Sequence, residues 1–400
     1  MSLVKSLGGS TAISALGTIS SYALTILLAR DGGSINFGTY ALCLAWAAIM
    51  TTLIDCASDA AFTHLTTRKG NPQAAFDTIF TVRLSVFVIL GCVLGIARLA
   101  ELIDMPWQTF LLLLPAFNFG VLFEYQRSNL SFAAIICAEK FLLLFCNAIL
   151  LSFFTFGDVV YVCYAAVSFA SLLVQAAVYR RFLLRLKPAP AREILFYVAS
   201  YWPLLTIALA QLGYGHLSRI IIQGKQGLEV FAAVSLAFQF ITLASIFQSQ
   251  VDRAFRPLLI AAMRQNNKES GYDLVGRYLI FATLPMAMGA ALIFALAPQL
   301  IHMIYGPEYA LAGQVLREIS PLFVSISLVR LADLTLLSLD LIRHNLFVNV
   351  AVSFMMLLIM FSLSASSPLS LFIRVIVVAQ FVQAAVGGML AYGALRWRVS

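Results

Sequence analysis

The chain has 400 residues, of which 61% are hydrophobic and 11% are charged, and its formal net charge at pH 7 is +8. Soluble proteins carry roughly 45–50% apolar and about 25% charged residues, so this chain has too few polar side chains to cover a globule in water. The composition excludes an ordinary soluble domain and indicates that lipid surrounds most of the protein. The basic excess is then typical of cytoplasmic loops, and nucleic acid is not expected as a partner.

Twelve apolar stretches approach or exceed the roughly 20 residues that a membrane-spanning helix needs. The first six are 10–29, 37–57, 75–99, 107–123, 132–154 and 159–178. The other six are 194–215, 230–250, 279–304, 309–334, 346–363 and 369–395. The first stretch ends without a small-residue cleavage site, so we expect a retained span and not a signal peptide. The pattern predicts an all-α integral membrane protein with about twelve transmembrane helices.

A short basic segment, 180–192, separates the two sets of six spans. It contains Pro188 and Pro190, which stop a helix from continuing through it. It also contains five basic residues and no acidic one: Arg180, Arg181, Arg185, Lys187 and Arg192. We therefore predict an N-terminal six-helix lobe at 1–179, a cytoplasmic linker at 180–192 and a C-terminal six-helix lobe at 193–400.

The distribution of Lys and Arg predicts the orientation of the spans. If the N-terminus is cytoplasmic, seventeen of the 26 basic residues fall in cytoplasmic segments and four in outer segments. Since basic residues concentrate in cytoplasmic loops, both termini are predicted to be cytoplasmic. Each lobe then begins and ends on the same side, so a duplication would be a parallel repeat. One short match supports it, because Asp59 to Phe62 resembles Asp252 to Phe255 at a spacing of 193 residues.

Motifs for catalysis or metal binding are absent from the sequence. There is no Gly-x-x-x-x-Gly-Lys-Ser/Thr loop for ATP, and the four histidines are far apart without metal-ligand spacing. The six cysteines all lie within apolar runs of the first half, as expected for small buried hydrophobic residues. We expect neither an enzyme nor a bound cofactor.

Three parts of the chain resemble the Wzx-type flippases of lipid-linked oligosaccharides, a family of the multidrug/oligosaccharidyl-lipid/polysaccharide (MOP) exporter superfamily. They are Leu27–Arg30 with Phe37–Leu42, Ser218–Glu229, and Tyr305–Tyr309 with Val315–Arg317. The family usually has Asp-Arg where this chain has Ser218-Arg219, so an acidic partner for that arginine is missing. The resemblance covers nearly the whole chain in span order and loop length. It implies two six-helix lobes in a V-shaped, MATE-like arrangement around a central cavity.

Ionisable residues inside the predicted spans are candidate functional residues, because charges in the membrane are costly and usually face a cavity. Arg30 and Arg219 are added because they stand at outer helix ends in the two halves. Arg330 and Asp333 are also three residues apart on one helix and could form a structural ion pair. The candidates for binding an anionic substrate are Lys140, Arg30, Arg219, Arg317, Arg330 and Arg83. Asp55 and Asp333 are the candidates for coupling to a proton or sodium gradient.

The predicted function is to carry an undecaprenyl-pyrophosphate-linked oligosaccharide repeat unit across the bacterial inner membrane to the periplasmic face. Such a unit serves O-antigen, capsule or exopolysaccharide synthesis, and the resemblance implies membrane lipid, the polysaccharide polymerase and the chain-length machinery as partners. Fixed cations would replace the water that the pyrophosphate loses. The alternatives are a multidrug or cation antiporter of the same superfamily, a membrane-embedded polysaccharide polymerase or ligase, and a passive scaffold.

Overall fold

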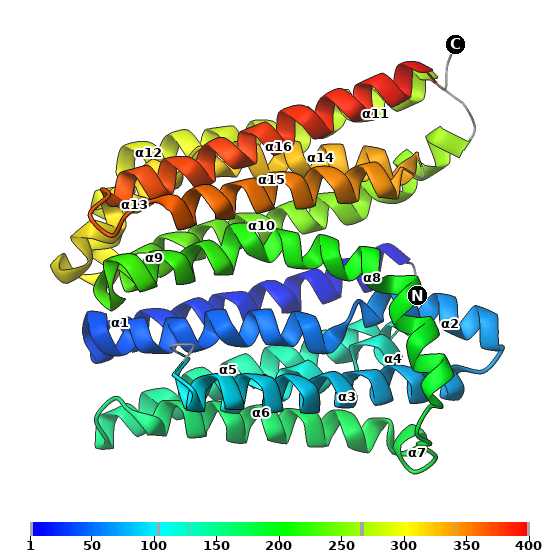
Figure 1. Ribbon diagram of the computed structural model, residues 1–400, viewed down its shortest axis with the longest axis horizontal. Coiled ribbons are helices and arrows are strands. Elements are labelled where there is room, and N and C mark those ends of the chain that lie inside the picture. Colours follow the sequence, from blue (N-terminus) through cyan, green and yellow to red (C-terminus); the bar gives the residue numbers. More distant parts are fainter. Residues whose placement is uncertain (1–2, 102–104, 127, 265–267, 340, 398–400) are drawn as a thin grey trace. The chain divides into compact units, whose positions relative to one another are not determined.

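The computed structural model describes residues 3–101, 105–126, 128–264, 268–339 and 341–397. Every regular element in these ranges is a helix (Figure 1), which confirms the predicted all-α class. The chain divides into two compact units, Met1–Leu209 and Ala210–Ser400. The lobe and linker boundaries predicted at 180–192 stay a prediction.

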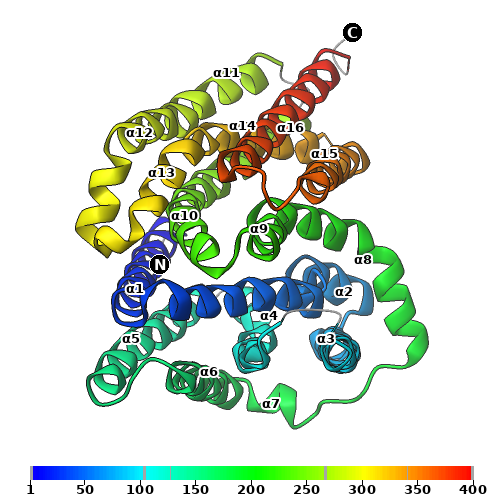
Figure 2. The ribbon, with the colours of Figure 1, turned by 60° about the vertical axis from the view of Figure 1, so that its left-hand side comes forward.

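The first unit consists of nine helical elements, the last of which crosses the unit boundary. They are α1 (Leu3–Asp55), α2 (Ser58–Lys69), α3 (Pro72–Leu99), η1 (Trp107–Phe117), α4 (Gly120–Tyr125), α5 (Asn129–Phe153), α6 (Asp158–Val178), α7 (Arg180–Leu183) and α8 (Ala191–Leu212). Helix α1 packs against α5 and η1, and η1 packs against α6 (Figure 2).

Helix α1 contains the first two predicted spans. Gly33 interrupts it with φ 63° and ψ 179°, a combination that glycine adopts readily because it has no Cβ. The two helical segments that meet at this glycine are both drawn in blue (Figure 1). Two left-handed residues, Cys56 and Ala57, then separate α1 from α2.

Aromatic side chains form much of the core at one end of the first unit. The ring of Phe76 stacks on Phe119 at 5.9 Å, and Phe123 meets Tyr179 edge to face at 4.7 Å. Phe182, from the predicted linker, contacts Phe76 at 5.9 Å. Burial of such rings removes a large apolar area from water, so this part of the linker packs on the first unit.

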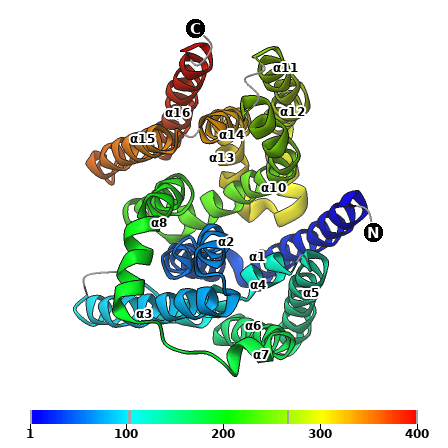
Figure 3. The same cartoon turned by 90° about the vertical axis from the view of Figure 1, so that its right-hand side faces the viewer.

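The second unit consists of the end of α8 and eleven further elements. They are η2 (Gly213–Leu217), α9 (Ser218–Gln226), α10 (Leu228–Arg264), α11 (Lys268–Tyr278), η3 (Leu279–Thr283), α12 (Leu284–Tyr305), η4 (Pro307–Tyr309), α13 (Ala310–Ile319), α14 (Leu322–Ser338), α15 (Ile342–Ser362) and α16 (Leu369–Trp397). Helix α14 contacts α10, α12, α15 and α16 (Figure 3). Most of its residues are buried, so polar side chains on α14 are enclosed by protein.

Nine helices among the described residues are long and apolar enough to cross a membrane, or ten if one bent pair counts as a single span. This count takes α1 once, although α1 contains two of the predicted spans. It leaves out 107–123, a shorter apolar stretch. Both the total of twelve and the cytoplasmic location of the termini stay predictions.

Three predicted spans differ from the structure. The fourth, 107–123, is a 3₁₀ helix followed by the short α4, and Pro115, which has no amide hydrogen to donate, lies near the break. The seventh continues from α8 through a π-helical turn into α9 and ends only at Gly227, whose φ is 88°. The tenth is bent by 45° between α13 and α14, next to Pro321.

Candidate functional site

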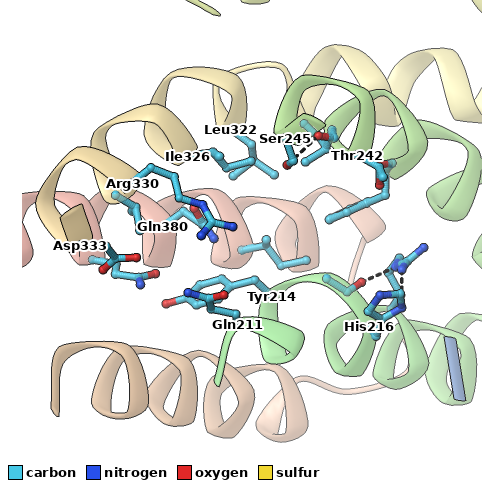
Figure 4. A pocket seen from close by; sticks show the side chains of 17 residues that line it. Gln211, Tyr214, His216, Thr242, Ser245, Leu322, Ile326, Arg330, Asp333 and Gln380 are labelled. Atoms are coloured by element: carbon cyan, nitrogen blue, oxygen red, sulfur yellow. Dashed lines mark hydrogen bonds between the residues drawn. The ribbon is translucent and has the colours of Figure 1, made fainter. Parts of the chain in front are cut away.

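A cavity of about 230 Å³ lies inside the second unit. Four stretches of helix line it: residues 211–219 from α8, η2 and α9, 238–245 from α10, 322–333 from α14, and 376–383 from α16 (Figure 4). All four belong to helical segments with the length and apolar composition of membrane spans. Placing charged and amide side chains in such segments costs free energy unless the side chains face a cavity or bind a ligand.

The π-helical turn at Gly213–Leu217 forms one wall of the cavity. Gly213 faces Ser353 of α15, and a Cβ at position 213 would overlap the serine hydroxyl. That hydroxyl donates to the Ala210 carbonyl at 2.8 Å. Glycine is therefore needed here for the close approach of α15, and the wider π turn displays Tyr214 and His216 on the cavity wall.

Arg219 is held in place at one end of the cavity. Its Nε donates to the Gly215 carbonyl and its Nη2 donates to His216 Nδ1 at 2.8 Å. The guanidinium carbon lies 5.4 Å from the centre of the Phe238 ring, within the range of a cation–π interaction. The arginine predicted to stand at an outer helix end thus lies within the helix and lines the cavity.

Arg330 lines the cavity from α14 and makes no hydrogen bond or salt bridge among the described residues. The ion pair expected with Asp333 is not formed. Asp333 instead accepts a hydrogen bond from Asn349 Nδ2 at 3.4 Å, and Gln383 Nε2 donates to Asn349 Oδ1 at 2.8 Å. An amide network between α14, α15 and α16 therefore holds the carboxylate, and the charge of Arg330 acts on that carboxylate only from beyond salt-bridge distance.

Three further polar atoms on the cavity wall are buried without a hydrogen-bond partner among the described residues. They are the hydroxyl of Tyr214 and the amide oxygens of Gln380 and Gln383. Tyr214 is 6% exposed and Gln383 is 3% exposed. Since an unpaired buried polar group costs about 1–3 kcal/mol, a molecule that hydrogen-bonds to these atoms would be stabilised in the cavity.

In the first unit, Arg83 and Asp55 are partners of each other. Arg83 is 3% exposed, and its Nη2 contacts Asp55 Oδ1 and Ser58 Oγ. Its Nη1 donates to the Asn118 carbonyl at 2.8 Å. A predicted substrate-binding cation and a predicted ion-coupling carboxylate thus form one salt bridge.

The remaining predicted cations lie apart from the cavity lining. The Lys140 ammonium is 5.9 Å from the centre of the Tyr164 ring. Arg317 is exposed in the last turn of α13, 4.6 Å from the ring centre of Phe294. Arg30 is exposed three residues before the break at Gly33. Among the predicted residues, the cavity brings together Arg219, Arg330 and Asp333.

Sequence reasoning missed the amides and the tyrosine of the cavity. Gln380 and Gln383 are three residues apart inside an apolar span, and Gln211 and Tyr214 have the same spacing. Residues three apart share a helix face, so each pair was a readable sign of a polar face in the membrane. The described residues contain no cluster of three or more His, Cys, Asp or Glu that could hold a metal ion.

Neither a protein-family model nor a curated protein matches the chain, but solved structures do. An inward-facing multidrug resistance MATE family transporter of the MOP superfamily superposes with a TM-score of 0.60 at 17% identity, over 99% of this chain and 95% of that one. A MOP superfamily transporter from Pyrococcus furiosus gives 0.59 at 15% identity, over 98% and 96%. The lipid II flippase MurJ, in an inward closed conformation, gives 0.71 at 10% identity, over 99% and 87%.

The chain has the fold of these MOP transporters. The likeness extends over nearly its whole length, which confirms the predicted similarity to that superfamily at the level of the fold. At 10–17% identity the neighbours show the fold alone, so the substrate has to be argued from the residues of this chain.

Proposed function

We propose that the protein is a membrane transporter that flips a lipid-linked oligosaccharide. Its substrate would be an undecaprenyl-pyrophosphate-linked repeat unit for O-antigen, capsule or exopolysaccharide synthesis. The repeat unit would pass from the cytoplasmic to the periplasmic face of the bacterial inner membrane. The two units, with both termini cytoplasmic, would expose the substrate path alternately to each side.

The observation that carries this proposal is the charge of the second-unit cavity. Two arginines and one carboxylate line it, and Arg330 makes no hydrogen bond or salt bridge in the described part of the chain. A lipid-linked oligosaccharide leaves water only where fixed polar groups replace its hydration, and guanidinium groups donate hydrogen bonds both to anionic oxygens and to sugar hydroxyls. The fold likeness to a lipid II flippase supports the same substrate class.

The membrane potential helps such a reaction. An inside-negative potential favours outward movement of an anion by about 2.3 kcal/mol per charge per 100 mV. Coupling to a proton or sodium gradient is therefore not required by energy, and Asp333 is our candidate if coupling occurs, because Asp55 is held by Arg83. Lys140, Arg30 and Arg317 stay predicted contacts along the substrate path, and the polymerase and chain-length machinery stay predicted partners.

A multidrug or cation transporter is the second candidate. Asp333 in the cavity wall would be the counter-ion of a cationic drug, and the fold likeness to a multidrug MATE transporter favours it. The guanidinium of Arg330 argues against it, because Arg330 lines the same small cavity and would repel the cation.

The test is the pool of lipid-linked intermediates in cells that lack the gene. A flippase predicts complete, cytoplasm-facing repeat units that accumulate while surface polymer is lost. If glycans are unchanged and the cells become sensitive to drugs, the protein is instead a multidrug transporter. If repeat units reach the outer face but are not lengthened, the result would indicate a polymerase.

Complementation with variants then tests the cavity. Arg330→Gln should restore surface polymer at about a tenth or less of the wild-type level, because a hydrogen bond to a charged group contributes about 1.5–3 kcal/mol. Arg374→Gln, at an exposed arginine of α16 outside this cavity, is the matched control and should complement fully. Full complementation by Arg330→Gln at normal membrane abundance would contradict the proposed role of the cavity.

A further inference from the structure

The second-unit cavity combines unpaired hydrogen-bond donors with unpaired acceptors. The guanidinium of Arg330 makes no hydrogen bond or salt bridge among the described residues, and the Tyr214 hydroxyl is a further donor without a hydrogen-bond partner there. The amide oxygens of Gln380 and Gln383 are acceptors that also lack a hydrogen-bond partner among the described residues. Figure 4 shows Arg330, Gln380 and Tyr214 among the side chains that line the cavity.

This combination excludes simple ions as the best-fitting occupant. A metal ion or organic cation would satisfy the amide oxygens and Asp333 but would meet the charge of Arg330. A phosphate or carboxylate would satisfy Arg330 but would leave the acceptors Gln380 and Gln383 unpaired, at about 1–3 kcal/mol each. A hydroxyl group both donates and accepts hydrogen bonds. A molecule with several hydroxyl groups can therefore pair with both the donors and the acceptors of the cavity wall.

The size of the cavity limits the occupant to one ring. Its volume is about 230 Å³, which is below the roughly 300–1,000 Å³ of pockets that hold drug-sized ligands. A single pyranose fills this space, and further sugars of a chain would extend out through the open side of the cavity. The remaining wall is apolar, with Leu322, Ile326 and Ile376 among its members, and it suits the C–H face of a sugar ring.

We propose that this cavity binds one neutral, hydroxyl-bearing sugar residue and thereby selects the glycan. The inference rests on the proposed flippase function for its biological meaning and assigns the pyrophosphate no place in this cavity. Arg330 and the Tyr214 hydroxyl donate to sugar hydroxyls, and Gln380, Gln383 and Asp333 accept from them. Arg330→Gln weakens export in this scheme because the sugar is no longer held.

The test is direct binding to the purified full-length protein in lipid nanodiscs, measured by saturation-transfer NMR. The probes are neutral methyl glycosides of the common hexoses, 6-deoxyhexoses, pentoses and N-acetylhexosamines, with inorganic pyrophosphate and tetraphenylphosphonium as the anionic and cationic probes. At least one glycoside should bind. Its affinity should fall about tenfold in Gln380→Leu and in Gln383→Leu, each of which removes one hydrogen-bonding partner from the cavity wall.

Controls separate a binding defect from a folding defect. Arg374→Gln should bind the glycoside like the wild type, and each variant is accepted only if its size-exclusion profile and melting temperature match the parent. Should Gln383→Leu fail this criterion because its amide also bonds Asn349, Gln380→Leu alone decides, since it has no such bond among the described residues. If none of the glycosides binds, or if only pyrophosphate or only tetraphenylphosphonium binds, the proposed sugar site is wrong.

The outcome is independent of the flippase assay because binding involves no transport. A cavity that binds a glycoside, in a chain whose loss leaves lipid-linked intermediates unchanged, would contradict the proposed function alone. Accumulated intermediates together with a cavity that binds no glycoside would contradict the sugar site alone.

Discussion

The salt bridge between Arg83 and Asp55 is predicted to hold the first unit together, and a double-mutant cycle tests this. The Arg83 side chain is 4% exposed and that of Asp55 is 31% exposed. The arginine also binds Ser58 Oγ and the Asn118 carbonyl. Arg83→Met replaces it with an apolar side chain of similar length, and Asp55→Asn removes the opposite charge.

The expected magnitude follows from what each variant leaves behind. Breaking a fully buried ion pair on one side costs about 3–5 kcal/mol, and the partial exposure of Asp55 reduces this to about 2–3 kcal/mol for Arg83→Met. For a unit of this size, that is a fall of about 4–12 °C in melting temperature. The double variant has no uncompensated charge, so it should recover about 1–2 kcal/mol of the loss.

The assay is the melting temperature of the purified protein in detergent, followed by size-exclusion chromatography, with surface polymer measured in cells. Arg374→Met, at an exposed arginine of α16, is the control and should melt like the wild type. If the double variant melts no higher than Arg83→Met, the two residues are not coupled and the structural role is refuted. If the double variant is stable but exports nothing, Asp55 or Arg83 serves transport directly.

Two further predictions concern stability. Gly313→Ala should destabilise the second unit by about 1–3 kcal/mol, because the new Cβ would lie 2.9 Å from Pro298 Cα, a backbone atom; Gly289→Ala, whose Cβ meets nothing within 4 Å, is its control. Equal melting temperatures for the two variants would contradict this packing. Tyr197→Phe should cost about 1–3 kcal/mol, since the buried hydroxyl donates at 2.8 Å to a main-chain carbonyl between α1 and α2. The same change at exposed Tyr392 should cost nothing measurable, and a Tyr197 variant as stable as the Tyr392 variant would show that this bond contributes little.

The helical class and most spans could be predicted because they depend on local composition alone. A run of about 20 apolar residues has few options other than a helix in lipid. The seventh span was predicted too short, because its polar last part does not have the apolar composition of a membrane span. The span was predicted to end at Gly215 with Arg219 beyond it, whereas the helix continues to Gln226, and His216 and Arg219 line a cavity.

The side-chain contacts of the charged residues could not be predicted, because they depend on distant parts of the sequence. Arg83 and Asp55 are 28 residues apart and lie on different helices. Arg330 and Asp333 have the spacing of a helical ion pair, yet Asn349 of α15 holds the carboxylate. Local spacing shows which groups are able to meet, and the helices packed around them decide which groups do.

Each unit has a polar contact that starts from a corresponding position, although the second partner does not correspond, since 193 residues beyond Arg83 is Gly276. Asp55 and Gln248 are 193 residues apart, the same spacing as in the short repeated match. In the first unit, Asp55 at the end of α1 binds Arg83 of α3. In the second, Gln248 of α10 donates to the Tyr278 hydroxyl of α11, which donates to Asp252 at 2.6 Å.

One unit thus makes this contact with an ion pair and the other with an amide and a hydroxyl. The common requirement is a buried polar connection from the end of the second predicted span to the following helices, and a net charge is not part of it. The charge of Arg83 is thus neutralised by a salt bridge within the first unit. Arg330 forms no salt bridge among the described residues and lines the cavity. An arginine within the membrane is therefore better assigned to substrate by the partners it lacks than by its depth in a span.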